Sequence, residues 1–363
     1  MLFGRKKMRN DIQSVGKAVV SELSADIRLT LDAQHVASSW REKPRPAEGN
    51  DNAPFALLSY YEPTCGFVNP GDAIQTIAVR HALEKAGVST IQSGRLIRDE
   101  LSLYGGPAVR CVMQGWFSHG HLFWPSPSIR PIFIGTHLTA PAQAFVSRLV
   151  EYAPDIRRSA EIGCRDLFTL DFCRSIGIKS YFSRCLTLSL PRRNLEEKGS
   201  RVFLVDIPEE YMRFIPKDVS RDAKSICQRH YPSDIGGARF SPSEQEYLAE
   251  SFLATYRTEA SLVVTTAIHV AMPCIAMGIP VVFVEGPVAR DPNRYTSLSG
   301  IIPVHTRGEL RGGRIDFHPQ CPDIERLKEA LVENLRLSIA KEAGKPVDDL
   351  ALEDVRQQIV EWR

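Results

Sequence analysis

Residues 263–284 read VVTTAIHVAMPCIAMGIPVVFV, and this run determines the class of fold to expect. Its pattern predicts a buried strand, a tight turn, a short helix opening near His269, a break at Gly278-Ile279-Pro280 and a second buried strand. In open α/β sheets, ligands bind at the carboxyl ends of strands, where helices begin. His269 lies at such a point and can exchange a proton near neutral pH. The alternative is a core histidine that bonds to a backbone carbonyl.

The rest of the chain repeats this alternation of apolar strands and amphipathic helices. Further strands are expected at residues 55–61, 108–113, 131–135, 159–164, 179–182, 201–206 and 223–228. Helices are expected at residues 73–85, 140–152, 167–176, 243–257 and beyond residue 323. This order is typical of parallel sheets covered by helices. The simplest architecture is an α/β fold with two Rossmann-like domains that face a cleft.

Changes in composition divide the chain into four expected regions. Residues 1–53 form a helical N-terminal extension and a linker rich in charge, proline and glycine. Residues 54–190 form the first Rossmann-like domain, and residues 191–320 form the second. Residues 321–363 are expected to form C-terminal helices.

The composition excludes several classes of protein. Of the 363 residues, 43% are hydrophobic and 24% are charged, as in an ordinary globular protein. The net charge of +2 argues against bulk binding of nucleic acid. None of the eight cysteines has zinc-ligand spacing, so we expect reduced thiols in a cytoplasmic protein. The basic residues 5–9 allow peripheral contact with an anionic membrane surface, although a solvated tail is the simpler interpretation.

Two short segments place chemically useful residues between a strand and a helix. Gly71 permits close approach of a ligand to helix amides, and Asp72 either contacts that ligand or only stabilises the helix N-terminus. A second strand ends at Gly163, and Arg165 and Asp166 then open a helix. An arginine in this position is well placed to bind a carboxylate or a phosphate. The alternative is a surface ion pair of Arg165 with Asp166, worth little energy.

A third segment, residues 113–121, is expected to be a loop that follows a strand. Its Trp116 can stack on a sugar face or pack beneath the loop. His119 and His121 resemble a metal pair but lack a third ligand, so no metal is expected. The chain has no GxGxxG, GxxxxGK[ST] or GxSxG motif, and no cofactor is expected.

Taken together, these segments resemble the polysaccharide pyruvyl transferase family over about residues 54–305. The matching pieces, in the family's order, are residues 69–75, 114–117, 131–135, 163–166 with Thr169, 265–269 and 278–280. The resemblance implies a fold similar to that of GT-B glycosyltransferases. It also implies transfer of a pyruvyl group from phosphoenolpyruvate, or a similar anionic donor, to two hydroxyls of a glycan or lipid-linked sugar. The product that the resemblance implies is a ketal used in surface-glycan synthesis.

The resemblance assigns the motif histidine to His269, as the acid or base, and the motif arginine to Arg165, as a ligand of phosphate or carboxylate. The other residues expected to bind substrate are Gly71, Asp72, Trp116, Thr266 and Arg294. The family often carries an arginine two residues before its histidine, where this chain has Ala267. Arg294 or Arg290 would then have to supply the missing cation.

Two other functions remain open at this point. One is a glycosyltransferase that uses a nucleotide sugar, with Glu285 binding the ribose hydroxyls. The other is a non-catalytic carbohydrate-binding relative that kept the scaffold and lost the donor site.

Overall fold

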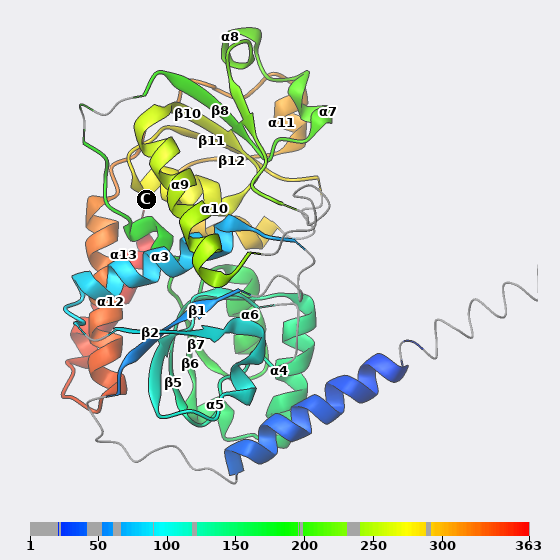
Figure 1. Cartoon of the computed structure of the whole chain (residues 1–363), viewed down its shortest axis with the longest axis vertical. Coiled ribbons are helices and arrows are strands. Elements are labelled where there is room, and N and C mark those ends of the chain that lie inside the picture. The colour runs from blue at the N-terminus through cyan, green and yellow to red at the C-terminus, as the bar shows by residue number, and fades with distance from the viewer. Residues whose placement is uncertain are drawn as a thin grey trace, which may run out of the picture.

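The chain forms a mixed α/β structure with two parallel sheets (Figure 1). The structure is a computed structural model that describes residues 21, 23–41, 53–60, 67–89, 91–117, 122–194, 196, 199–230, 240–287 and 292–362. The first sheet has seven strands in the order β2-β1-β3-β5-β6-β7, with β4 paired to β5, and the second has five in the order β12-β11-β10-β8-β9. The prediction of parallel sheets covered by helices is confirmed.

The strands of the first sheet are β1 (Phe55–Ser59), β2 (Ile91–Ile97), β3 (Val109–Val112), β4 (Gly115–Phe117), β5 (Ile129–Leu138), β6 (Glu161–Cys164) and β7 (Lys179–Phe182). Those of the second are β8 (Arg201–Val205), β9 (Lys224–Ile226), β10 (Ala260–Thr265), β11 (Val281–Val284) and β12 (Val304–His305). The main helices are α3 (Pro70–Lys85), α4 (Ala140–Tyr152), α6 (Leu167–Ser175), α9 (Pro242–Glu259), α10 (Ile268–Ala276), α12 (Glu325–Glu342) and α13 (Asp349–Glu361).

Two predictions near the site differ from the structure. Helix α3 begins at Pro70, three residues earlier than expected, because the Asn69 side chain accepts a hydrogen bond from the amide of Gly71 and caps the helix. The expectation that Trp116 lies in a loop is wrong. Residues Gly115–Phe117 pair with β5 as the strand β4, which is too short to produce a sequence pattern.

One hydrophobic core runs through both sheets. Helix α3 contacts α9, α10 and α12, and its Ile74 and Val79 share a buried cluster with Val263 of β10 and Met272 of α10. Figure 1 shows α3 lying between the two sheets. Since α3 also packs on β1, its N-terminus is held where residues of both sheets meet.

The C-terminal helices return to the first sheet. Glu342 of α12 pairs with Arg110 of β3 and with Arg130 of β5, and Arg356 of α13 pairs with Glu161 of β6. The helices α12 and α13 confirm the helical prediction for residues beyond 323, and their ion pairs join them to the first sheet.

Arg184 anchors the end of α13 from inside the protein. It adopts φ +54°, and its guanidinium donates to the carbonyls of Ile359, at 2.9 Å, and Ser297, at 2.9 Å. The carbonyls at a helix C-terminus lack partners within the helix, so a cation there stabilises it. The same side chain thereby fixes η5 (Pro292–Leu298), a 3₁₀ segment that reaches the candidate site described below.

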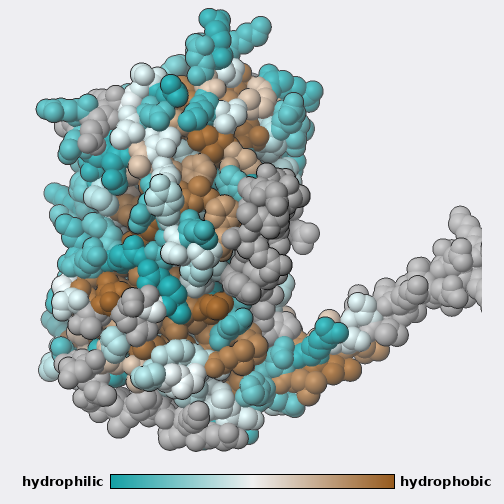
Figure 2. Space-filling view, in the orientation of Figure 1, coloured by the Kyte–Doolittle hydropathy of each residue, from teal (hydrophilic) through white to brown (hydrophobic). Residues whose placement is uncertain are grey.

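A helix over residues 23–41 projects from the body of the protein (Figure 1). Its C-terminal part is buried through Val36 and Ala37. Leu23, Ile27 and Leu31 are 57–59% exposed on the projecting part, and apolar surface follows this helix in Figure 2. Among the helices of the described ranges, none is both long and apolar enough to span a bilayer.

Substitution of Gly163 by alanine is expected to destabilise the protein by about 1–3 kcal/mol, because the added methyl would overpack a central strand. Its Cβ would lie 2.5 Å from the carbonyl oxygen of Phe133 and 2.8 Å from the hydroxyl of Tyr181. Gly105→Ala is the control, since nothing lies within 4 Å of its added Cβ. Urea denaturation measures both variants. Equal stability of the two would contradict the prediction.

Candidate active site

A cavity of about 810 Å³ lies where the carboxyl ends of strands from both sheets meet. The first half of the chain contributes residues of α3, β4 and the turn after β6, and the second half contributes the segments after β8, β9, β10 and β11. Of the predicted site residues, those that line the cavity are Asp72, Trp116, Arg165, Thr266, His269 and Arg294. The structure thus brings six residues from distant parts of the sequence to one place.

His269 lies in the first turn of α10 and bridges the two halves of the chain. Its Nδ1 lies 3.0 Å from the carbonyl oxygen of Gly71, and its Nε2 lies 3.0 Å from Nη1 of Arg165. A guanidinium can only donate, so Nε2 is the acceptor and the ring proton is on Nδ1. Both sequence interpretations of His269 therefore hold geometrically: it bonds to a backbone carbonyl, and it lines the cavity. Gly71 contributes this carbonyl from behind the cavity wall.

The surroundings keep His269 neutral. Burial lowers the pKa of His269 to about 3, and the positive charge of Arg165 acts in the same direction. The Gly71 carbonyl opposes this shift only in part. At neutral pH the imidazole is therefore a neutral group whose lone pair on Nε2 is covered by Arg165.

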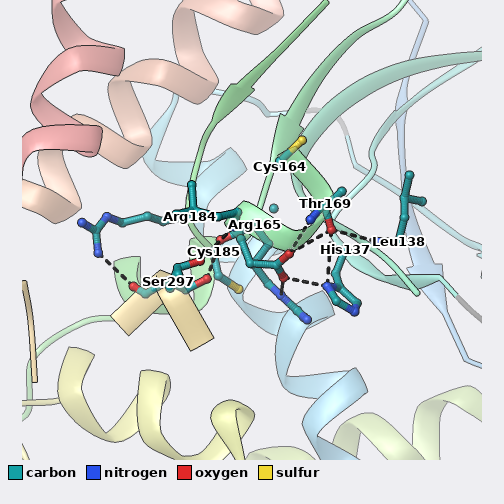
Figure 3. A network of polar contacts seen from close by, with 12 residues as sticks. His137, Leu138, Cys164, Arg165, Thr169, Arg184, Cys185 and Ser297 are labelled. Atoms are coloured by element: carbon teal, nitrogen blue, oxygen red, sulfur yellow. Dashed lines mark hydrogen bonds and ion pairs between the residues drawn. The ribbon is translucent and has the colours of Figure 1, made fainter. Parts of the chain in front are cut away.

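Arg165 is buried and oriented by three groups, of which Ser297 is labelled in Figure 3. Its Nε lies 3.4 Å from Oδ2 of Asp166, its Nη1 contacts His269, and the hydroxyl of Ser297 donates to its carbonyl. The interpretation of Arg165 and Asp166 as a surface pair is wrong, because their side chains are 2% and 0% exposed. Asp166 also caps α6 by accepting from the amide of Thr169 at 3.0 Å.

His137 was not identified from the sequence, yet it belongs to this network. Its Nδ1 lies 2.6 Å from Oδ2 of Asp166 in the buried interior (Figure 3). Burial lowers the pKa of His137 to about 4, although Asp166 opposes the shift. A continuous chain of polar contacts therefore runs from His137 through Asp166 and Arg165 to His269. His137 lies within β5, where no sequence motif marks it as a site residue. Only its pairing with Asp166 identifies it.

Asp72 lies in the first turn of α3 and faces the same cavity. Its Oδ1 accepts from Nε2 of Gln75 at 3.2 Å, and its Oδ2 lies 4.0 Å from Nη1 of Arg98. Arg98 is fully buried and bonds in two places to Asp99, at 3.1 and 2.8 Å. Burial raises the pKa of Asp72 to about 6, against the opposing charge of Arg98.

Thr266 and Arg294 complete the predicted set. The Thr266 hydroxyl donates to the carbonyl of Asp206 at 2.7 Å, which ties the end of β10 to the end of β8. Arg294 lies on η5, and its buried Nε has no hydrogen-bond partner among the described residues. Arg290, His119 and His121 lie outside the described residues.

Several cavity residues gave no signal in the sequence. Asp206, Cys227, Gln228 and Arg229 follow β8 and β9 and also line the cavity. With Arg165 and Arg294, Arg229 gives the cavity three guanidinium groups. Arginine side chains suit carboxylates and phosphates, so the lining favours an anionic ligand. Within the ranges that the structure describes, no group of three or more His, Cys, Asp or Glu side chains could hold a metal ion.

Comparison with known proteins agrees with this geometry. A profile of the polysaccharide pyruvyl transferase family matches residues 69–286, more than half of the chain. Searches of curated proteins and of solved structures found no match. The matched range contains Gly71, Asp72, Trp116, Arg165 and the His269 segment. The chain therefore belongs to the polysaccharide pyruvyl transferase family.

Proposed function

We propose that this enzyme transfers the pyruvyl group of phosphoenolpyruvate to two hydroxyls of a glycan or lipid-linked sugar and forms a ketal for surface-glycan synthesis. The contact between Arg165 and His269 carries the proposal. It sets an anion-binding group against a neutral proton acceptor on the wall of one cavity. This is the pairing that an anionic donor and an attacking hydroxyl require.

The architecture proposed for this function is GT-B-like. Its two Rossmann-like domains would span residues 54–190 and 191–320, with the C-terminal helices of residues 321–363 joining them. The separation of the first seven strands from the last five in two sheets supports this division. The cavity residues that follow β6 and β10 come from different sheets, as expected of a cleft between two domains.

Donor binding is proposed to release His269. The donor carries a phosphate and a carboxylate, and each competes with the imidazole for the donors of Arg165. Arg294, whose buried Nε has no hydrogen-bond partner among the described residues, and Arg229 would replace the arginine that the family often has at the position of Ala267. Once Arg165 turns to the anion, Nε2 of His269 is uncovered and accepts the proton of the attacking hydroxyl.

We also propose that the enzyme works in the cytoplasm, with peripheral contact to an anionic membrane through the basic residues 5–9. Support for the compartment comes from the cysteines, since seven of them lie in the described ranges as free thiols.

A thermal-shift comparison tests the choice of donor. Phosphoenolpyruvate is expected to raise the melting temperature, because a ligand that binds only the folded state stabilises it by about 2.7 kcal/mol at 100 times its Kd. UDP- and GDP-sugars serve as the comparison ligands for the glycosyltransferase alternative. A shift with a nucleotide sugar and none with phosphoenolpyruvate would overturn the proposal. A shift with neither, together with one from a simple glycan, would favour the non-catalytic relative.

A further inference from the structure

A second proton-exchanging side chain, Asp72, lines the same cavity as His269. Asp72 follows Gly71, whose carbonyl oxygen accepts the Nδ1 proton of His269. Both residues are buried, and both line the cavity. The first turn of α3 therefore holds the histidine through its backbone and places a carboxyl group on the wall of the same cavity.

The contacts of Asp72 leave its carboxyl able to hold a proton. Arg98, the nearest cation, directs its Nε and Nη2 to Asp99 and approaches Asp72 only to 4.0 Å. The other charges facing Asp72 are Arg165 and Arg229, which favour its carboxylate, and Asp99, which disfavours it. Burial outweighs them, so the pKa of Asp72 lies near 6, above its ordinary value.

The other carboxyl groups near the cavity have structural contacts. Oδ1 of Asp206 accepts from the amide of Gln228 at 2.9 Å and so holds the segment after β9. Asp166 is fully buried and bonds to His137, Arg165 and Thr169. Among these carboxyls, Asp72 is the one that directly follows the residue bonded to His269.

We propose that Asp72 is the catalytic acid that protonates the methylene carbon of phosphoenolpyruvate, while His269 is the base toward the sugar hydroxyl. This inference rests on the proposed function. In the first step the carbon–carbon double bond takes the Asp72 proton at C3, which becomes a methyl group. The first hydroxyl oxygen bonds to C2, and its proton passes to Nε2 of His269. Asp72 is then a carboxylate and His269 an imidazolium.

The second step restores both groups. The bond from C2 to the phosphate oxygen breaks with its electron pair on the phosphate, which takes the proton of His269. The second hydroxyl bonds to C2, and its proton passes to the carboxylate of Asp72. The products are the ketal and inorganic phosphate, and no other reactant is needed. One acid that starts protonated and one base that starts neutral complete the cycle without exchange with solvent.

The test compares Asp72→Asn with the wild type and with Asp171→Asn, which removes the same charge from an exposed residue of α6. Calorimetry measures binding of phosphoenolpyruvate, and phosphate release is followed with a panel of methyl hexopyranosides as acceptors. Asp72→Asn is expected to bind the donor within about threefold of the wild type and to lose about 10²- to 10⁴-fold in kcat. Asp171→Asn is expected to match the wild type.

Asp72→Glu separates acid catalysis from a structural role. This variant keeps a carboxyl that can titrate, so its kcat is expected to recover part of the loss seen in Asp72→Asn. The pH at which its activity falls on the alkaline side should differ from that of the wild type. The activity of the wild type should decline as the pH rises past about 6, because the reaction needs the protonated form of Asp72, which is lost as the pH rises through its pKa. If Asp72→Asn keeps its kcat within threefold, the role of Asp72 is wrong and the proposed function stands. If the wild type neither binds nor consumes phosphoenolpyruvate, the proposed function itself fails.

Discussion

Replacing His269 with glutamine is expected to lower kcat by about 10²- to 10⁴-fold, the usual contribution of a positioned acid or base. Glutamine can still donate to the Gly71 carbonyl that His269 contacts at 3.0 Å, so α3 and α10 should remain together. It cannot accept and then return a proton, which the proposed reaction requires at Nε2. Steady-state phosphate release measures the loss, and the melting temperature checks that the variant is folded.

The outcome separates the two roles of this histidine. A folded variant with a kcat within threefold of the wild type would show that His269 only joins α3 to α10. A lower kcat with unchanged donor affinity would agree with proton transfer, since removal of an interaction made only in the transition state lowers kcat and leaves binding intact.

Replacing Arg165 with glutamine is expected to weaken phosphoenolpyruvate binding by about 10- to 150-fold. This corresponds to the loss of about 1.5–3 kcal/mol for a hydrogen bond to a charged group. Arg165 is buried, and it is the cation in direct contact with His269. Arg165→Lys keeps the charge without the planar fork, so it should recover part of the affinity. Calorimetric titration of phosphoenolpyruvate measures all three proteins.

The same substitution has a second, independent consequence for His269. The charge of Arg165 helps to hold the pKa of His269 near 3, after burial. Removing a neighbouring cation favours the charged imidazolium, so the pKa of His269 should rise in Arg165→Gln. Nuclear magnetic resonance of the imidazole across a pH series follows this change. An unchanged titration, together with unchanged donor affinity, would contradict the role given to Arg165.

The fold could be predicted from the sequence because its strands are apolar runs and because recognisable residues mark the ends of its helices. Residues 263–284 predicted β10, α10 and β11 in the correct order. Strand β2 was missed because residues 91–97, IQSGRLI, mix glycine and polar residues with apolar ones. Its register also shifts along β1. Tertiary pairing decides such segments more than local propensity.

The site was predictable only where a residue follows a strand in a recognisable segment. His269 and Arg165 met this condition, and the structure brings them within 3.0 Å of each other. The environment that sets their chemistry was not predictable. His137 lies within a strand, and Arg98 with Asp99 forms a buried pair far from any motif. Proton affinities depend on burial and on charges brought together by the fold, which sequence spacing does not encode.

A crystal structure of the protein soaked with phosphoenolpyruvate tests the central claim most directly. We expect the donor in the 810 Å³ cavity, with the Arg165 guanidinium on its phosphate or carboxylate and no longer on Nε2 of His269. The methylene carbon should then face Asp72. An empty cavity at a saturating concentration of phosphoenolpyruvate, or a donor bound away from Arg165 and His269, would contradict the account.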